Sequence, residues 1–584
     1  MNGEKKKELS PELRILLASI LSMAVIIGWT KFFGFKTPPP NATPTSAPIT
    51  APAPSAAVGA TAPTAASVTP SAPSKSSTQP LAPVRTDTQE RTIVVENDFY
   101  RVEISNRGAV VKSWQLKRYK DDAKPQRTLD LVHPDAAAQT GGWPFSIVLD
   151  DAALESAANS ALYQTPSATS LQAPADAEFI WSNGQLEVTK RFHFDHTYVV
   201  RVETSAKLNG AQISAGLAWR GGFGDVTVRD PAPVEQVNTL YSQGGKLQTL
   251  PHKKLNGPEQ WGRGGWQSGA DFAGIEDRYF TAVFLPAGGS APGTMATRYL
   301  KLARTVQVAD KQEQEPVAET AVTTAAQPLD VRVYLGPKDY DVLKKMTPPL
   351  HALVQFGWFE IIADPMFHLL KWLHSYIPDW GWAIIVLTIV INMLFFPLRI
   401  SGYRTAQKMQ RIQPEVKVIQ ERYKKYSMRD QQKQGEKNQA IMALYKREGI
   451  NPASGCLQML LQMPIWIGLN SALRGTIELR HASWMWLRDL SAKDPYYILP
   501  VLMGVSMYLV SKMTPMATTD PQQQMMMKIM PVMMSVIFVI SPFSSGLALY
   551  IATSSVVGIG QQWFLNRTHP ATAPTPAKLP RGKK

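Results

Sequence analysis

The feature that most constrains the fold is a series of apolar runs in the last part of the chain. Five runs follow one another with turn residues between them: Trp380–Leu398, Leu457–Leu473, Ile498–Met513, Lys528–Ile540 and Leu547–Leu565. A helix needs about 20 apolar residues to cross a hydrocarbon core of about 30 Å. Several runs are shorter, and each of these alone is also compatible with a buried or re-entrant helix. In succession, they predict five membrane-spanning helices in a locally thinned bilayer.

A further apolar run lies near the N-terminus. The run Ile15–Trp29 follows a basic stretch that contains Lys5, Lys6, Lys7 and Arg14. This arrangement is typical of a cleaved signal peptide or of an uncleaved signal anchor. We expect the anchor, because no A-x-A cleavage site precedes the following linker and no cysteine there could carry a lipid.

Composition excludes several classes of protein. The single cysteine, Cys456, excludes a disulfide framework and a thiolate metal cluster. The formal charge of +15 would ordinarily suggest a nucleic-acid partner. Because the basic residues lie beside apolar segments, they indicate membrane topology and attraction to anionic lipids, and we expect no DNA binding.

The distribution of basic residues predicts the orientation in the membrane. The loop Arg399–Gly449 has 13 Lys or Arg against 5 Asp or Glu, and the segment after Asn566 has five basic residues and no acidic one. The segment Gly475–Tyr496 has three of each sign. Since Lys and Arg concentrate on the cytoplasmic side, the basic loop and both termini are predicted to be cytoplasmic. An even number of spans is consistent with that placement.

The region between the first and second apolar runs is predicted to be outside the membrane. Residues 37–84 contain twelve prolines among Ala, Ser and Thr, which predicts an extended tether. From about Thr92 the period is two, as where Val331 and Val333 alternate with Arg332. Such segments bury one face each and predict a β-sandwich of roughly 250 residues, with no strong helical period before Asp341.

Two helical segments are predicted outside the spans. Phe367, Leu370, Leu373 and Tyr376 recur on one side of a helix, with Trp372 near them, which predicts an amphipathic helix on the outer membrane surface. A simple lead-in to the next span is the alternative.

The basic loop is predicted to form a helical hairpin, with Pro414 at the start of its first helix and Gly449 at the end of its second. This hairpin could contact ribosomal RNA, anionic lipid or a nascent chain, or could simply be solvated.

Four segments of the last 215 residues or so carry a resemblance to a known family. They are NPASGCLQMLLQMPIWIGL (Asn451–Leu469), DLSAKDPYYILPVLMG (Asp489–Gly504), TDPQQQMMMKIMPVMM (Thr519–Met534) and SSGLALYIATSS (Ser544–Ser555). In sequence, order and spacing they resemble the YidC/Oxa/Alb family of membrane protein insertases. VENDFYRVEISNRGAVVKSWQLKRY and YLGPKDYD resemble the periplasmic domain of its six-span Gram-negative branch.

The resemblance implies an α-helical polytopic membrane core, with five insertase helices plus an N-terminal anchor helix and a large periplasmic β-supersandwich. It divides the chain into 1–36 (N-terminus and anchor), 37–90 (linker), 91–340 (β-sandwich), 341–379 (interfacial helix), 380–566 (insertase core, with the cytoplasmic hairpin 402–450) and 567–584 (basic tail).

It also implies a function in the inner membrane. Family members insert and help fold inner-membrane proteins, alone or with the Sec translocon, through a hydrophilic groove open to cytosol and lipid. Nascent inner-membrane proteins are the implied clients, with the Sec translocon, the ribosome and anionic lipids as further partners. We expect no enzymatic activity, cofactor or metal, and the chain contains no G-x-x-x-x-G-K-[ST] motif for nucleotide hydrolysis.

Polar residues within the apolar runs are the candidate groove residues. A polar or charged side chain inside a membrane span is costly and marks a functional site by default. The candidates for the groove are Asn392, Arg399, Gln458, Gln462, Asn470, Ile551 and Ser554, and those for a pliable cytoplasmic surface that meets the client are Met525, Met526, Met527 and Met530. Hydrogen bonding between helices is the alternative for the polar set, and ordinary packing is the better explanation of the methionines.

Two positions depart from the family pattern. Family members usually have a basic residue, most often arginine, where this chain has Asn392, and a tyrosine where it has Ile551. Arg399 lies seven positions after Asn392 and so shares its helix face. We expect it to supply the missing charge at the mouth of the groove.

Two other functions compete with this interpretation. A transporter or channel is one, although the apolar region shows no repeated halves, which many transporters have. An enzyme in the outer domain is the other. His193 and His196 flank Asp195 and suggest a metal site, but on one strand they would point to opposite faces.

Overall fold

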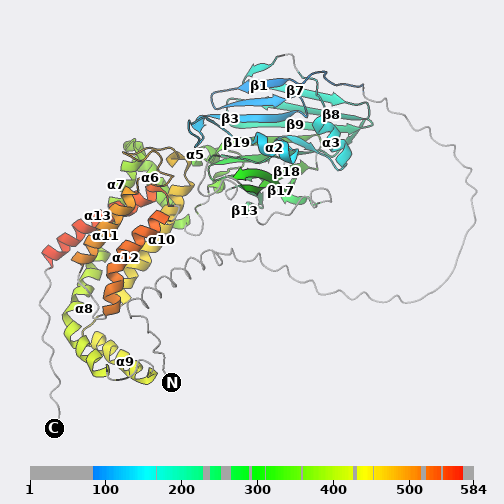
Figure 1. Cartoon of the computed structure of the whole chain (residues 1–584). Coiled ribbons are helices and arrows are strands. Elements are labelled where there is room, and N and C mark those ends of the chain that lie inside the picture. The colour runs from blue at the N-terminus through cyan, green and yellow to red at the C-terminus, as the bar shows by residue number, and fades with distance from the viewer. Residues whose placement is uncertain are drawn as a thin grey trace, which may run out of the picture. The chain divides into compact units, whose positions relative to one another are not determined.

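The fold is described from a computed structural model of the whole chain (Figure 1). The structure describes residues 83–569 except 166–167, 226, 228–236, 252–264, 288–292, 309–310, 326, 355, 357–359, 425, 427–429, 451–452, 515–520 and 541–542, and it leaves the side chains of 306–308, 311, 313, 431, 453–461, 474, 521–524, 527 and 528 undescribed. The predicted anchor, most of the linker and the tail beyond residue 569 lie outside the described residues.

Three β-sheets form the region between residues 92 and 337 (Figure 1). The five-stranded sheet β4-β3-β2-β1-β6 consists of β4 (Thr128–Asp130), β3 (Val110–Lys120), β2 (Tyr100–Ser105), β1 (Thr92–Glu96) and β6 (Ser170–Gln172). The nine-stranded sheet, in the order β13-β12-β15-β16-β19-β9-β8-β7 with β10 beside β9, consists of β13 (Lys246–Pro251), β12 (Asn238–Gln243), β15 (Phe272–Glu276), β16 (Phe280–Pro286), β19 (Leu329–Pro337), β9 (Val199–Leu208), β8 (Leu186–Phe194), β7 (Ala175–Ser182) and β10 (Ala211–Ile213). The remaining sheet, β14-β17-β18-β11-β5, consists of β14 (Gln267–Ala270), β17 (Met295–Val308), β18 (Lys311–Thr324), β11 (Gly216–Trp219) and β5 (Ser146–Val148).

The sheets bury their alternate residues against one another. Along β8, every second residue is buried and the residues between are half-buried, as period two predicts. Phe145 lies between two sheets, with its ring 5.6 Å from Phe192 of β8 and 6.1 Å from Trp219 of β11. The predicted β-sandwich class is confirmed.

Two short helices in this region were not predicted. They are α2 (Pro134–Thr140) and α3 (Ala152–Ser160). The Asp151 carboxylate caps α3 by accepting hydrogen bonds from the backbone N–H groups of Ala153 and Leu154. Both helices are rich in alanine, so their apolar period is too weak to stand out from the surrounding strands.

Helices form the rest of the described chain (Figure 1). They are α5 (Tyr340–Lys344), η3 (His351–Leu353), α6 (Glu360–Tyr376), α7 (Trp380–Leu394), α8 (Phe396–Tyr423), α9 (Gln431–Arg447), α10 (Ala453–Gly475), η5 (Ile477–Leu479), α11 (Ile498–Met513), α12 (Pro521–Ile540) and α13 (Ser545–Thr568). Each of the five apolar runs overlaps one of these helices, except that Trp380–Leu398 covers α7 and the start of α8. The predicted class, a helical core after a β-sandwich, is confirmed.

The helices of the core pack closely. α10 packs against α6, α13 against α7, and α11 against both α12 and α13. Gly504 of α11 permits one such approach, because a Cβ there would lie only 2.0 Å from Ser535 Oγ of α12. Small residues in this position are typical of helix pairs in membranes.

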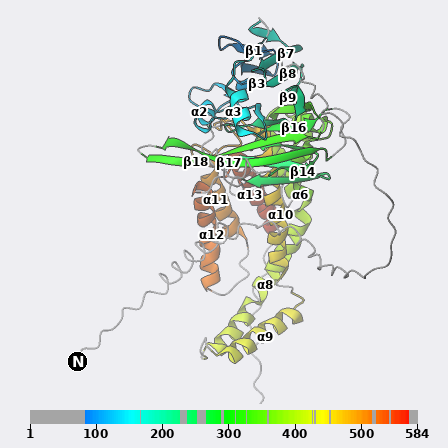
Figure 2. The ribbon, with the colours of Figure 1, turned by 90° about the vertical axis from the view of Figure 1, so that its right-hand side faces the viewer.

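The basic loop is a hairpin, but its first helix begins earlier than predicted. Figures 1 and 2 both show α8 and α9 side by side, and Ile412 and Val416 of α8 share a small apolar cluster with Leu444. Pro414 lies inside α8, which already begins at Phe396, so the predicted start was wrong. Proline removes a single backbone donor, and a long helix can tolerate that loss at the cost of some strain.

The predicted helix corresponds to α6, and the residues of its apolar side differ in burial. Phe367, Leu370 and Leu373 are buried, whereas Tyr376 is exposed and packs edge-on against Trp372. The helix ends at Tyr376, so this last residue has no neighbouring turn to cover it.

Length and apolar composition identify only one candidate membrane span among the described helices, and it is a bent pair. No single helix meets both criteria. α7 and α8 meet them together across a bend of 54°, while α11 and Ile529–Ile540 of α12 are apolar but shorter.

Candidate functional site

Four of the polar side chains in the apolar helices form a connected series that we call the polar ladder: Asn392 of α7, Arg399 of α8, and Ser554 and Gln561 of α13. Asn392 Nδ2 donates to Ser554 Oγ at 3.2 Å. Gln561 Nε2 donates to the Asn392 backbone carbonyl at 3.1 Å, and Arg399 Nη1 donates to Gln561 Oε1 at 2.8 Å. Hydrogen bonds therefore connect all four residues, two between side chains and one through the backbone carbonyl of Asn392, between helices that are about 160 residues apart in the sequence.

Helical spacing explains why these residues meet. Ser554 and Gln561 are seven positions apart in α13, so they lie on the same face two turns from each other. Asn392 lies near the end of α7 and Arg399 in the first turn of α8, so the prediction that they share one helix face was wrong, because a bend of 54° at Phe395 separates the two helices. Because α7 packs along α13, the two pairs come into register.

Arg399 is the charged member of the ladder. Its guanidinium is half-buried and lies against Gly558, where a Cβ would approach Nη2 to 3.1 Å. No carboxylate among the described residues forms an ion pair with it, and its hydrogen-bond partner is the neutral Gln561. A half-buried cation that is satisfied only by neutral groups can still attract an anionic group of another molecule.

Asn392 has partners for both ends of its amide. Its Nδ2 also donates to the backbone carbonyl of Thr388 at 2.8 Å, and its Oδ1 is 3.3 Å from Ser554 Oγ. Hydrogen bonding between helices, the alternative explanation for the polar residues, therefore applies to Asn392 and Ser554. This structural role is compatible with contact to a client, because a polar group of the client could replace one of the hydrogen bonds between Asn392 and Ser554.

The candidates in α10 lie apart from the ladder. Gln462 is exposed, and its Nε2 donates to Tyr550 OH of α13 at 3.0 Å. Asn470 joins neither group, because its Oδ1 is buried without a hydrogen-bond partner. Gln458 lies in α10, four positions before Gln462, but its side chain is among those not described.

The apolar candidates differ in exposure. Ile551 is half-buried and packs against the apolar cluster of the helical core, one residue after the Tyr550 that Gln462 contacts. Met525, Met526 and Met530 of α12 are exposed, and the side chain of Met527 is not described. Exposed methionines offer a flexible apolar surface, as their proposed role requires.

Sequence reasoning did not identify a second polar group at the far end of α13. Tyr403 OH donates to Asn566 Oδ1 at 2.8 Å, and Asn566 Nδ2 donates to the backbone carbonyl of Met513 at 3.1 Å. Gln562 donates to the same carbonyl at 3.4 Å. These contacts tie the ends of α8, α11 and α13 together. The spacing of Gln562 and Asn566, four positions apart, was the available signal.

Comparisons with known proteins give the same family for both regions. The family described as 60Kd inner membrane protein matches residues 372–572, and the family described as YidC periplasmic domain matches residues 92–369. A membrane protein insertase YidC of Geobacter metallireducens is 32% identical over 571 residues, which are 95% of this chain and 98% of the relative. One of Wolinella succinogenes is 33% identical over 84% of each chain.

The chain also resembles solved structures at low identity. The crystal structure of an active YidC insertase with its first transmembrane domain resolved is 17% identical, with a TM-score of 0.34, over 84% of this chain and 95% of that one. The crystal structure of YidC from Thermotoga maritima is 14% identical, with a TM-score of 0.30, over 82% and 99%.

Proposed function

This chain belongs to the YidC family of membrane protein insertases, and we propose that its polar ladder receives the polar segments of a client during insertion. The clients are nascent membrane proteins, as the insertase function requires. The observation that carries the proposal is the position of Arg399, a half-buried cation hydrogen-bonded to a neutral glutamine within otherwise apolar helices.

The physical reason lies in the cost of moving charge across a bilayer. A charged residue at the bilayer centre costs about 2.5–3.5 kcal/mol on insertion scales. A polar ladder that is open to water from the cytosol would shorten the apolar path and would offset part of that cost. The apolar part of the client could then move sideways into lipid, and the free energy of its partition would drive the step without nucleotide hydrolysis.

Arg399 would replace the basic residue that the family usually has where this chain has Asn392. Its distance from Asn392 is bridged by Gln561, which bonds the Asn392 carbonyl with its amide nitrogen and Arg399 with its amide oxygen. A client carboxylate at this point would have the guanidinium as donor and the amides of Asn392 and Gln561 as further partners. We therefore expect Arg399 to favour clients with acidic translocated tails.

The second contact of the client would lie beside Tyr550. Gln462 and Tyr550 join α10 to α13, and Ile551 follows directly. The exposed Met525, Met526 and Met530 of α12 would supply an adaptable apolar surface on the cytoplasmic side. Gln458, one turn before Gln462, and Asn470 are weaker candidates, since neither has a described contact with the ladder.

The predicted topology is part of the proposal. The α8–α9 hairpin and both termini would face the cytosol, and the β-sandwich would face the periplasm, as the name of the matching family model suggests for its members. The predicted boundaries at residues 36, 90, 340, 379 and 566 belong to the same proposal. The hairpin would be available to ribosomes and anionic lipids, and the Sec translocon would be an optional partner. The family is not an enzyme family, and we propose no catalytic activity.

The transporter alternative is not favoured, because the named relatives across most of the chain are insertases. The test uses the protein in proteoliposomes with two clients that differ only in whether the translocated tail is acidic or uncharged. Arg399→Ala is expected to reduce insertion of the acidic client about tenfold and to leave the uncharged client almost unchanged. Such a factor corresponds to about 1.4 kcal/mol, which is of the order of one charge-assisted hydrogen bond.

Arg404→Ala is the matched control, because Arg404 is an arginine of the same helix that bonds His569 and lies outside the ladder. It is expected to insert both clients as the wild type does. Equal loss in the two arginine variants, or equal insertion of the acidic client by Arg399→Ala and the wild type, would contradict the role of Arg399.

A further inference from the structure

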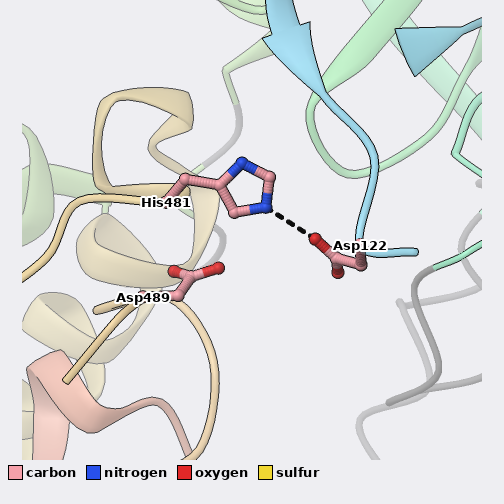
Figure 3. Close-up of side chains that lie close together, drawn as sticks. All are labelled: Asp122, His481 and Asp489. Atoms are coloured by element: carbon pink, nitrogen blue, oxygen red, sulfur yellow. Dashed lines mark hydrogen bonds and ion pairs between the residues drawn. The ribbon is translucent and has the colours of Figure 1, made fainter. Parts of the chain in front are cut away.

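Three side chains that can bind a metal meet where the β-sandwich region approaches the segment between α10 and α11 (Figure 3). Asp122 follows β3, while His481 and Asp489 lie between α10 and α11. One ligand atom from each residue lies within 4.8 Å of the other two. His481 Nε2 is 2.6 Å from Asp122 Oδ1, and Figure 3 shows the Asp489 carboxylate beside this pair.

The local backbone holds each of these residues in position. Asp489 Oδ1 accepts hydrogen bonds from the Ser491 N–H and hydroxyl, each at 2.7 Å, while no donor among the described residues meets its Oδ2. The Asp122 backbone N–H donates to Thr227 Oγ1 at 2.7 Å. His481 has a φ of +59°, a left-handed conformation that non-glycine residues rarely adopt, which fixes its Cβ direction.

The cluster of Asp122, His481 and Asp489 carries more negative than positive charge. Among the described residues, the arginine that forms an ion pair with the cluster is Arg480, whose Nη2 is 3.7 Å from Asp122 Oδ1. Arg480 is already neutralised by a closer ion pair with Asp225, and both side chains of that pair are almost fully buried. Its guanidinium also lies over the Phe280 ring. Asp122 and Asp489 therefore leave two negative charges beside one imidazole, the charge that a divalent cation balances.

His193 also lies between two carboxylates, but there arginines balance the negative charge. His193 lies between Asp176, at 2.7 Å, and Glu203, at 3.7 Å. Two arginines surround Glu203, with Arg191 at 3.3 Å and Arg201 at 3.0 Å, so the carboxylate is already paired. His196, the other histidine of the sequence motif, lies beyond the end of β8.

We propose that Asp122, His481 and Asp489 bind one divalent transition-metal ion of the zinc class and so tie the β-sandwich region to the α10–α11 segment. An imidazole with two carboxylates provides nitrogen and oxygen ligands that suit zinc, at bonds of about 2.0–2.2 Å. Water would complete a four-coordinate site. Asp122 is exposed, so its carboxylate can move closer to His481 and Asp489. The metal would then take the place of the hydrogen bond between Asp122 and His481.

This inference does not depend on the proposed role of the polar ladder. It concerns residues at the other end of the helical core, and the three ligands contact none of the four ladder residues. The contact between Asp122 and His481 joins positions that are 359 apart in the sequence, so no local motif predicts it. Metal binding would add a constraint between two regions that already share the Arg480–Asp225 ion pair.

The experiment measures Zn²⁺ binding by the untagged full-length protein in lipid nanodiscs after removal of metal with a chelator. Calorimetric titration with Zn²⁺ alone and metal analysis after dialysis give affinity and stoichiometry. We expect one Zn²⁺ per wild-type chain, and at least tenfold weaker binding in each of Asp122→Asn, His481→Gln and Asp489→Asn. Co²⁺ should give the visible absorption of a four-coordinate site in the wild type and lose it in the variants.

His193→Gln is the matched control and should bind as the wild type does. Asp489→Asn keeps the oxygen that caps Ser491, and Asp122→Asn lies on an exposed turn, so the metal-free unfolding midpoints of these two variants should equal that of the wild type. Stoichiometric binding that survives all three ligand substitutions, or a wild type that takes up no more Zn²⁺ than the triple variant, would overturn the proposal. Loss of binding in His193→Gln alone would also overturn it.

Discussion

The β-sandwich region and the helical core place their apolar residues in opposite ways. Between residues 92 and 337, no large hydrophobic side chain of the described part stands out as exposed, and Trp114 and Trp219 are almost completely buried. In the helical core, Leu394, Val501 and Ile540 are 72%, 61% and 73% exposed. Such a surface on α7, α11, α12 and α13 is expected of helices that face lipid, whereas the sandwich is built for water.

Polar groups show the converse difference. The sandwich buries ionisable side chains, such as Lys190 and the Arg220–Glu319 pair, and gives each of them several hydrogen-bond partners. In the helical core, the polar ladder is built of neutral amides and a hydroxyl with one cation, Arg399, beside them. The comparison leads us to expect that the charges buried in the sandwich serve stability, and that Arg399 of the ladder serves the proposed contact with clients.

The largest effect should come from the buried lysine of the sandwich. Lys190 Nζ donates to the backbone carbonyls of Gly108, Ala109 and Phe145, at 2.8, 3.2 and 2.7 Å. Lys190→Met leaves three buried acceptors without a donor, and we expect a loss of about 3 kcal/mol or more of unfolding free energy, since each costs about 1–3 kcal/mol. Chemical denaturation of the full chain, followed by tryptophan fluorescence, measures it.

Lys207→Met is the control for this loss. Lys207 is about half exposed and pairs with Glu187 at 3.4 Å on the surface of the same sheet. Its substitution should change stability by less than about 0.5 kcal/mol. A similar small change in Lys190→Met would remove the distinction between structural charge in the sandwich and functional charge in the core.

An acid-sensitive group should produce the next effect. Burial lowers the pKa of His133 from 6.5 to about 4, although its Nε2 lies 2.8 Å from the Gly224 carbonyl. Between these values the native state binds fewer protons than the unfolded state, so stability falls as the pH falls from 6.5 to 4. Relative to His133→Asn, the wild type should lose about 3 kcal/mol between pH 7 and pH 4, at 1.36 kcal/mol per pH unit.

The variant keeps a donor for the Gly224 carbonyl and has no titrating ring, so other groups cancel in the comparison. Denaturation curves at pH 7, 5.5 and 4 test the prediction for the sandwich transition. An equal loss of stability with falling pH in the wild type and in His133→Asn would show that protonation of His133 does not destabilise the β-sandwich region.

The smallest effect should come from the neutral part of the ladder. Hydrogen bonds between membrane helices contribute about 0.6 kcal/mol on average in double-mutant cycles. The cycle with Asn392→Ala and Ser554→Ala should therefore give a coupling of about that size, measured by unfolding in lipid or detergent. A coupling above about 2 kcal/mol would make the pair a structural lock and would weaken its assignment to client contact.

The sequence predicted the two regions because each has one strong period. Alternation along β8 and the apolar run of α11 are both local signals, and the structure has a strand and a helix there. α2 and α3 were not predicted, because alanine-rich helices show little apolar periodicity. The early start of α8 was not predicted, because a proline at position 414 is also typical of the first turn of a helix.

Asn392, Arg399 and Ser554 of the ladder were predicted as candidates, but their contacts were not. A spacing of seven positions places Ser554 and Gln561 on one face, but only the packing of α7 on α13 shows that Gln561 connects Asn392 to Arg399. Asn470 was predicted to lie near the face of Gln458 and Gln462, and it still lies outside the ladder. The position of a residue on a helix does not show which other helix packs against it. Contacts between distant segments, such as Asp122 with His481, depend on the tertiary fold and have no signal in the local sequence.

The most direct test of the central claim is site-specific photo-crosslinking to a stalled nascent membrane protein. Probes at Asn392, Gln462 and Ile551 are compared with probes at Val505 of α11 and Val556 of α13, which are exposed apolar positions outside the ladder. We predict strong adducts with the client at the first three positions and weak ones at the other two. Efficient insertion with adducts only at Val505 and Val556, or with none at Asn392, Gln462 and Ile551, would contradict the claim that the client passes along the polar ladder and the neighbouring Gln462–Tyr550 contact.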